Sequence, residues 1–113
     1  MTEINHLNFN DADLFIDNES DINQASRALK AMGHPLRLKI LCILASHKEA
    51  SVQDLVDFVG TSQSNISQHL SILREKGVLD SRKDANKVYY HIMNDKIVNL
   101  MGSMKDAFCH HQD

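Results

Sequence analysis

The sequence predicts a mainly α-helical domain that carries one small β-hairpin. Two observations support this fold class. Apolar residues recur at helical spacing before residue 77 and again after residue 93, whereas residues 78–92 have strand-like content around a short polar connection. The length of 113 residues fits one folded domain. We divide the chain into an acidic N-terminal arm, residues 1–20, and a folded domain, residues 21–113.

The first two expected helices lie on either side of Gly33. The first begins near Asp21 and carries apolar residues at helical spacing, namely Ile22, Ala25, Leu29 and Met32. Pro35 suits the first turn of the second helix, because the backbone N–H that proline lacks would have no partner there. Residues 36–46 are apolar on almost every side, so we expect the second helix to be buried.

Two further helices form a closely spaced pair. The first covers residues 51–59, and Ser51 with Asp54 three positions later marks its N-terminus. The second covers residues 62–76 and begins at the capping residue Ser62. A tight glycine turn joins them, which gives the pair the proportions of a helix-turn-helix unit.

A β-hairpin and a final helix complete the chain. Residues 78–83 and 87–92 are expected to pair around the polar connection at 84–86, and Asn94 can cap the last helix. That helix carries an apolar stripe too extensive to face water, and we expect it to pack, with residues 22–32, against a second copy of the chain. The expected dimer interface residues are Ile22, Leu29, Ile97, Leu100, Met101, Met104 and Phe108.

Charge is distributed unevenly, although the net charge is only −3. Residues 1–24 carry six acidic side chains and no basic one, whereas residues 25–113 carry twelve basic and nine acidic side chains, a balance of +3. The basic side chains within residues 61–92 are Arg74, Lys76, Arg82, Lys83 and Lys87. This modest basic stripe is compatible with phosphate contact, but it is insufficient to establish it.

The helix over residues 62–76 has an outer face rich in short hydrogen-bonding side chains, namely Gln63, Ser64, Asn65, Ser67, Gln68 and Ser71. Such side chains near a helix N-terminus can reach base edges in the major groove of DNA. The alternative is a solvated amphipathic helix, although such faces usually carry more Lys and Glu. The hairpin that follows fits a wing over the adjacent DNA backbone. The expected DNA-binding residues are Ser62, Gln63, Ser64, Ser67, Gln68, Arg74, Arg82, Lys83, Asn86 and Lys87.

Two stretches resemble a known family. Residues 62–79, SQSNISQHLSILREKGVL, are similar to the recognition helix of the ArsR/SmtB family of repressors, and residues 32–41, MGHPLRLKIL, resemble that family's opening motif. The similarity covers approximately residues 24–109. It implies a winged helix-turn-helix homodimer that binds an inverted-repeat operator in duplex DNA until a signal arrives. We expect His69 to be a hydrogen-bonded packing residue.

The metal sites common in this family are absent from the matching segments. The arsenic-type site needs two cysteines in the helix that precedes the recognition helix, and the matching residues 49–55 contain none. The zinc-type site needs several histidines on the last helix, and residues 95–105 supply only Asp95. A remaining possibility is a metal-responsive repressor that uses C-terminal ligands. These ligands would be Cys109, His110, His111 and Asp113, together with His6.

The two cysteines, Cys42 and Cys109, resemble in their placement the BigR/SqrR/HlyU branch of the family. In that branch a cysteine on the second helix faces one near the end of the last helix. The resemblance implies that reactive sulfur species or oxidants link the two sulfurs and release the operator, with no metal or cofactor needed. A buried, silent Cys42 and a winged-helix regulator without a sensor remain as alternatives.

Other classes of protein are disfavoured by the sequence. No nucleophile, base and pocket combination predicts an enzyme. A pure protein-interaction module would not require the Ser/Gln helix and the basic hairpin. No apolar run approaches the roughly 18 residues of a membrane span, and the acidic N-terminus has the wrong charge for a signal peptide. We therefore expect a cytoplasmic protein without a membrane partner.

Overall fold

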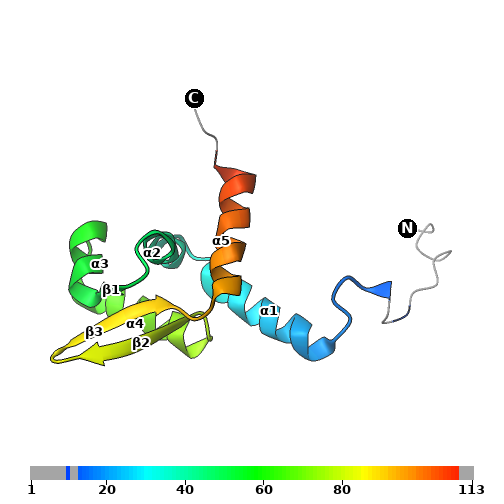
Figure 1. Ribbon diagram of the computed structural model, residues 1–113, viewed down its shortest axis with the longest axis horizontal. Helices are drawn as coiled ribbons and strands as arrows, with labels where there is room; N and C mark the ends of the chain where they lie inside the picture. Colours follow the sequence, from blue (N-terminus) through cyan, green and yellow to red (C-terminus); the bar gives the residue numbers. More distant parts are fainter. Residues whose placement is uncertain (1–9, 11–12, 110–113) are drawn as a thin grey trace.

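The computed structural model describes residue 10 and residues 13–109. Over these residues the elements follow in this order: α1 (Glu19–Met32), α2 (Pro35–Ser46), β1 (Ala50–Ser51), α3 (Val52–Val59), α4 (Gln63–Glu75), β2 (Leu79–Asp84), β3 (Lys87–Ile92) and α5 (Asp95–Phe108). The predicted fold class is confirmed, since a helical body carries one small sheet, and α1 and α5 extend away from that body (Figure 1). None of the described helices is both long and apolar enough to cross a membrane.

The ends of the first two helices are set by local hydrogen bonds. The Oδ1 atom of Asn18 accepts from the backbone N–H of Ser20 at 2.8 Å and of Asp21 at 3.2 Å. This cap starts α1 at Glu19, so the last two residues of the expected arm are helical. The ring of His34 caps α2 by accepting from the N–H of Leu36 at 3.1 Å, with proline in the first turn as expected.

The helix-turn-helix unit is bounded by caps that the sequence predicted. Ser51 and Asp54 form a reciprocal capping box at the start of α3. The Oγ atom of Ser62 accepts from the N–H of Asn65 at 3.1 Å at the start of α4. The turn between the helices contains Gly60, whose positive φ of 81° is a left-handed conformation that a side chain would strain.

The predicted hairpin forms the larger part of an antiparallel sheet with strand order β1-β3-β2. β2 and β3 pair from Leu79 opposite Ile92 to Asp84 opposite Lys87. The sequence did not predict β1, which pairs Ala50 with Tyr90 on β3 and has two residues only. A strand this short has no periodicity of its own to detect.

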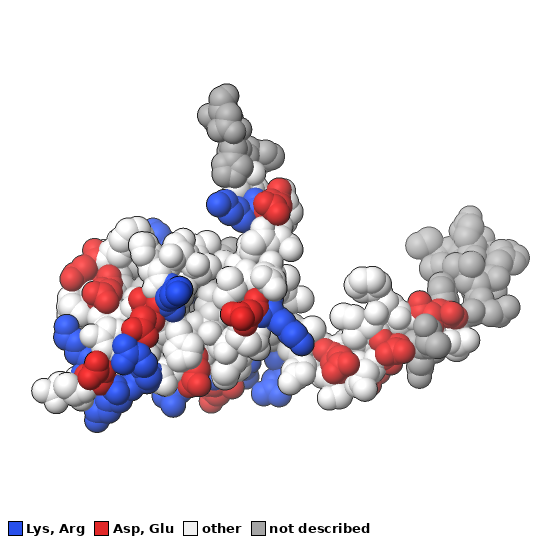
Figure 2. All heavy atoms as spheres, in the orientation of Figure 1, with Lys and Arg blue, Asp and Glu red and all other residues white. Residues whose placement is uncertain are grey.

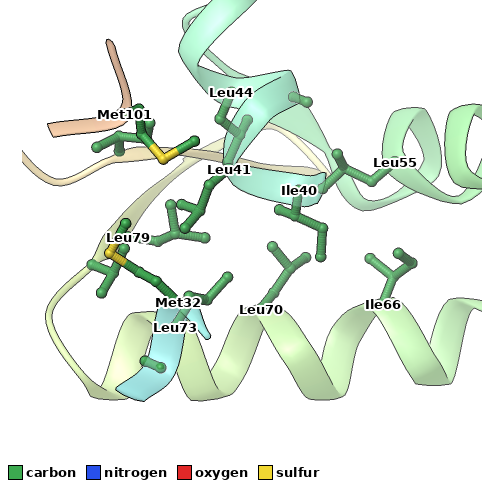
Figure 3. Close-up of a cluster of buried hydrophobic side chains, with 14 residues drawn as sticks. Met32, Ile40, Leu41, Leu44, Leu55, Ile66, Leu70, Leu73, Leu79 and Met101 are labelled. Carbon is green, nitrogen blue, oxygen red and sulfur yellow. The ribbon is translucent and has the colours of Figure 1, made fainter. Parts of the chain in front are cut away.

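The core lies between α2 and α4 (Figure 3). α4 contributes Ile66, Leu70 and Leu73, and α2 contributes the buried residues Ile40, Leu41 and Leu44. Leu55, Leu79, Met32 and Met101 close the cluster from the surrounding elements. The expectation that α2 is buried holds only for its inner side in the single chain, because the side of α2 opposite the core, including Cys42, is exposed.

Candidate nucleic-acid interface

The outer face of α4 is exposed because its opposite face is fixed in the core. Ser62, Gln63, Ser64 and Gln68 are exposed, whereas Ser67 is half-buried. Positions that differ by four residues lie on the same face of a helix, so Gln68 follows Ser64 along this face. The face therefore presents amide and hydroxyl groups in the first turns of α4, where a recognition helix contacts base edges.

The turn before α4 is held by side-chain hydrogen bonds. Ser62 uses its Oγ atom as the helix cap, and the Nδ2 atom of Asn65 donates to Oγ1 of Thr61 at 3.1 Å. These bonds fix the direction in which α4 starts. The N-terminus of a helix also attracts anions, because its first backbone N–H groups have no partners within the helix.

The wing, defined as β2 and β3 with their connecting turn, lies beside the N-termini of α3 and α4. One shallow pocket brings these parts together, and its lining residues are Ser51, Val52, Gln53, Gln63, Asn86, Lys87 and Val88. Lys83, Asn86 and Lys87 of the wing are exposed, as is Arg74 in the last turn of α4. The structure therefore brings Gln63 together with two of the predicted wing residues.

Basic side chains concentrate near the wing, whereas an acidic segment lies away from it. Figure 2 shows Lys and Arg side chains gathered at the end of the molecule that carries the wing, with some Asp and Glu among them, and Asp and Glu along the segment before α1 and at the start of α1. A basic surface of this kind attracts a phosphate backbone. The acidic segment lies away from it and does not cancel its local charge.

Arg82 differs from the other predicted DNA-binding cations, because its guanidinium is already paired. Its Nε and Nη2 atoms donate to the two carboxylate oxygens of Glu49 at 2.9 and 2.6 Å, and it lies over the ring of Tyr89 at 4.8 Å. The bond from Arg82 lowers the pKa of Glu49, and the same bond raises the pKa of Arg82. The roles of Glu49 and Tyr89 were not predicted from sequence. Glu49 is 33 positions from Arg82, beyond the reach of a local pattern, and the pairing of Tyr89 with Arg82 depends on the register of the hairpin.

A second cluster joins α4 to the region where α1 meets α2. The Nη1 atom of Arg37 lies 3.2 Å from Nδ1 of His69, and its Nε atom donates to the carbonyl oxygen of Ala31 at 2.5 Å. The rings of His69 and His34 are 4.6 Å apart. Burial, together with the neighbouring His34 and Arg37, lowers the pKa of His69. The expectation that His69 is a hydrogen-bonded packing residue is confirmed.

Both cysteines are free thiols at exposed positions. Cys42 lies on α2, and Cys109 is the C-cap of α5, where its N–H donates to the carbonyl oxygen of Lys105 at 2.9 Å. α2 and α5 pack against each other. Among residue 10 and residues 13–109, no group of three or more His, Cys, Asp and Glu side chains could hold a metal ion. The other proposed metal ligands, namely His110, His111 and Asp113 together with His6, lie outside the described residues.

The expected dimer residues divide into three groups by exposure. Four of them are exposed on α1 and α5, namely Ile22, Leu29, Leu100 and Phe108. Ile97 and Met104 are half-buried and pack against the core. Met101 is only 7% exposed and belongs to the core of the single chain.

Comparison with known proteins places this geometry in a family. Residues 34–81 match the family described as bacterial regulatory protein, arsR family. The HTH-type transcriptional regulator YgaV of Escherichia coli (strain K12) is 37% identical over 91 residues, which cover 80% of this chain and 92% of YgaV.

Solved structures agree with the sequence comparison. HlyU from Vibrio cholerae N16961 has a TM-score of 0.76 and 34% identity, and the match covers 82% of this chain and all of that chain. HlyU from the same strain has also been solved in a reduced form, with a TM-score of 0.73 and 35% identity over 81% of this chain and 96% of that chain. The transcriptional repressor BigR from Xylella fastidiosa has a TM-score of 0.73 and 31% identity over 82% of this chain and 94% of that chain.

These relatives are winged-helix regulators of transcription and not enzymes. The exposed polar face of α4, the adjacent basic wing and the matches over four-fifths of the chain lead to the same conclusion. The protein is a DNA-binding transcriptional regulator that belongs to the arsR family of bacterial regulatory proteins.

Proposed function

We propose that the protein is a homodimeric repressor that binds an inverted-repeat operator and releases it when Cys42 and Cys109 become covalently linked. The observation that carries the DNA-binding part is the position of the exposed Ser/Gln face of α4 next to the basic wing. The thiol part rests on the two exposed cysteines and on the likeness to HlyU and BigR.

The exposed side chains of α4 have the chemistry needed to read base pairs. The amide of Gln68 can pair with both the acceptor and the donor of an adenine edge in the major groove. Ser64 can contact a base or a phosphate. Lys83 and Lys87 on the wing would neutralise phosphates and fix the position of α4 in the groove. Gln63, Ser67, Asn86 and Arg74 extend this surface to either side.

A dimer is supported by the exposed apolar residues of α1 and α5. Phe108 and Leu29 are 75% and 53% exposed in the single chain. Burying such side chains against a second copy is favourable by roughly 25 cal/mol for each Å² of apolar surface. A two-fold dimer would place its two α4 helices in successive major grooves, about 34 Å apart.

The proposed link forms by sulfur transfer from a low-molecular-weight persulfide, RSSH. The thiolate of Cys109 attacks the outer sulfur of RSSH, the donor S–S bond breaks, and the thiol RSH is released. The thiolate of Cys42 then attacks Sγ of Cys109 and displaces the added sulfur as hydrogen sulfide. The two thiols are oxidised to a disulfide, and the transferred sulfur is reduced to sulfide. If Cys42 has also become a persulfide, its terminal sulfur attacks instead, and the products are a trisulfide and hydrogen sulfide.

Such a link would couple the thiols to DNA binding through the packing of the helices. α2 packs against both α4 and α5, and α5 carries two of the exposed apolar residues of the proposed interface. A covalent bond between Cys42 on α2 and Cys109 at the end of α5 would fix α5 in a new position. The two α4 helices of the dimer would then lose the spacing that the operator requires.

The test uses a DNA duplex selected from a random-sequence pool by the reduced wild-type protein. Wild type, Cys42→Ser and Cys109→Ser are treated with glutathione persulfide, and duplex affinity and intact mass are measured. We expect wild type to release the duplex and to lose two hydrogens, with or without the gain of one sulfur. Both single variants should stay bound. If either variant releases the duplex as wild type does, the two-cysteine switch is wrong.

The same assay separates the metal-responsive alternative, in which Cys109 and its C-terminal neighbours bind the inducer. Zinc is added without a persulfide. Release from wild type and from Cys42→Ser, but not from Cys109→Ser, would favour a metal site at the C-terminus. Retention of the duplex by all three proteins would exclude zinc as the inducer, and release of the wild type by the persulfide then separates the thiol switch from a regulator without a sensor.

A further inference from the structure

The wing is attached to the rest of the molecule along one side of β3. The short strand β1 pairs there, with Ser51 opposite Tyr89. On the other side of β3, Arg82 of β2 is also opposite Tyr89. Glu49 immediately precedes β1, in the loop that connects α2 to the helix-turn-helix unit.

Arg82 reaches from the edge strand β2 across the central strand β3 to Glu49, which precedes the other edge strand, β1. Its guanidinium lies over the ring of Tyr89 and reaches Glu49 with two parallel hydrogen bonds of 2.6 and 2.9 Å. The planar fork of arginine matches a carboxylate in this arrangement, which lysine could not reproduce. The side chains of Glu49, Tyr89 and Arg82, which we call the wing clamp, therefore connect all three strands.

The two charged members of the wing clamp, Glu49 and Arg82, neutralise each other. The Arg82 bond holds the pKa of Glu49 below its usual value, so both groups remain charged at neutral pH. A second carboxylate, that of Asp84, lies 3.8 Å from the Nη1 atom of Arg82. Lys83 and Lys87, by contrast, form no ion pair among residue 10 and residues 13–109. The positive charge of Arg82 is thus already compensated, whereas those of the two lysines are available to phosphates.

We propose that Glu49, Tyr89 and Arg82 position the wing relative to α4, and that Arg82 does not itself contact DNA. This inference rests on the proposed placement of the wing on the DNA backbone. The pocket between the wing and α4 supports it, because Asn86 and Lys87 lie there on the same surface as Gln63. A wing that is already fixed lets one DNA duplex contact α4 and Lys87 at the same time. Binding then carries no entropy cost for ordering a mobile wing.

The test compares variants that remove the geometry of the clamp with variants that remove a free charge. Glu49→Gln with Arg82→Gln leaves the net charge of the region unchanged, and Arg82→Lys keeps the charge but loses the fork. Lys83→Ala is the matched control on the same strand. Affinity for the selected duplex is measured over a series of salt concentrations, and thermal unfolding shows whether each variant is folded.

We expect the double variant to bind the selected duplex roughly fivefold more weakly, a loss that an exposed two-bond ion pair can account for. The slope of log affinity against log salt should not change, since no phosphate contact is lost. Arg82→Lys should show the same loss. Lys83→Ala should instead reduce the steepness of this slope by about one, because one phosphate contact is lost.

The decisive readout is the coupling between the wing clamp and Lys87. Lys87→Ala should weaken binding in the wild-type background and have at most half of that effect in the double variant. An equal effect in both backgrounds would overturn the positioning role. A second pair of results would also overturn it. If Arg82→Gln makes the salt dependence of affinity less steep by about one, and Glu49→Gln binds more tightly, then Arg82 is a phosphate contact restrained by Glu49. If Lys87→Ala has no effect even in wild type, the placement of the wing on DNA is wrong.

Discussion

Lys87 and Arg82 lie on the same hairpin and carry the same charge, yet they differ in what they already contact. Arg82 is bound to Glu49, whereas Lys87 is exposed at the turn beside Gln63. The same distinction applies along α4. His69 is engaged by Arg37 on the inner side of the helix, and Gln68 next to it is exposed. The role of a polar residue therefore depends on whether the fold has already used its hydrogen-bonding groups.

Replacing Gln68 by Ala should weaken specific binding selectively. Because the variant loses the amide contacts to a base edge, we expect its affinity for the selected duplex to fall roughly tenfold. Its affinity for a random duplex should stay the same. Ser71→Ala is the matched control, because Ser71 is exposed on the same helix but lies further from its N-terminus. Fluorescence anisotropy with both duplexes measures the effect. Equal losses on the two duplexes would contradict base reading by Gln68.

The orientation of α4 depends on contacts along its inner side and at its start. Its apolar face packs on α2, Ser62 caps its first turn, and His69 joins it to Arg37 and His34. The last contact depends on protonation. A proton on His69 would place a positive charge beside the guanidinium of Arg37 and the ring of His34, in a partly buried position.

Stability should therefore fall on mild acidification. Burial, with repulsion from His34 and Arg37, lowers the pKa of His69 in the folded chain below its unfolded value of about 6.5. Between these two pKa values the unfolded chain binds more protons, so the free energy of unfolding decreases as pH falls through this window. Above the unfolded pKa, His69 contributes no pH dependence.

Denaturant unfolding at a fixed protomer concentration, measured between pH 7.5 and 5.5, tests this prediction. His69→Gln should flatten the dependence on pH. His47→Gln should leave it unchanged, because His47 is exposed and not part of this cluster. Equal pH dependence in wild type and His69→Gln would show that protonation of this ring does not limit stability.

At the scale of the whole molecule, α1 and the end of α5 extend from a body that already has a closed core (Figure 1). Among their exposed residues these two helices carry four large apolar side chains that the described part of the single chain does not cover, namely Ile22, Leu29, Leu100 and Phe108. Met101 belongs to the core, so a charged residue there would unfold the protomer and say nothing about dimer formation. Phe108 is the better test of the interface.

Phe108→Glu should produce folded monomers. Phe108 is 75% exposed on α5, so a carboxylate is tolerated in the monomer but would be buried without a partner in the dimer. Phe58→Glu is the matched control, since Phe58 is 71% exposed on α3, away from the proposed interface. Sedimentation should show a monomer for the first variant and a dimer for the second. A Phe108→Glu dimer that still binds the selected duplex would remove α5 from the interface.

The sequence by itself determined the five helices and the hairpin, with most of their boundaries, because the signals for them are local. Ser51, Ser62 and Asn94 cap helices through hydrogen bonds to residues within three positions. Apolar spacing identified the face of α4 that contributes to the core, and the exposed Ser/Gln face followed from the same periodicity. The family motifs, which are also contiguous in the chain, indicated the class of function.

Only the tertiary structure decided which predicted residues are already engaged by other parts of the chain. The pairing of Arg82 with Glu49, the strand β1 and the burial of Met101 all depend on residues far apart in sequence. No local spacing encodes such contacts, because they form when separate elements pack and exclude water. The exposure of Cys42 has the same origin. α2 is apolar on nearly all sides, but within one protomer only the side that faces the core is covered by other elements.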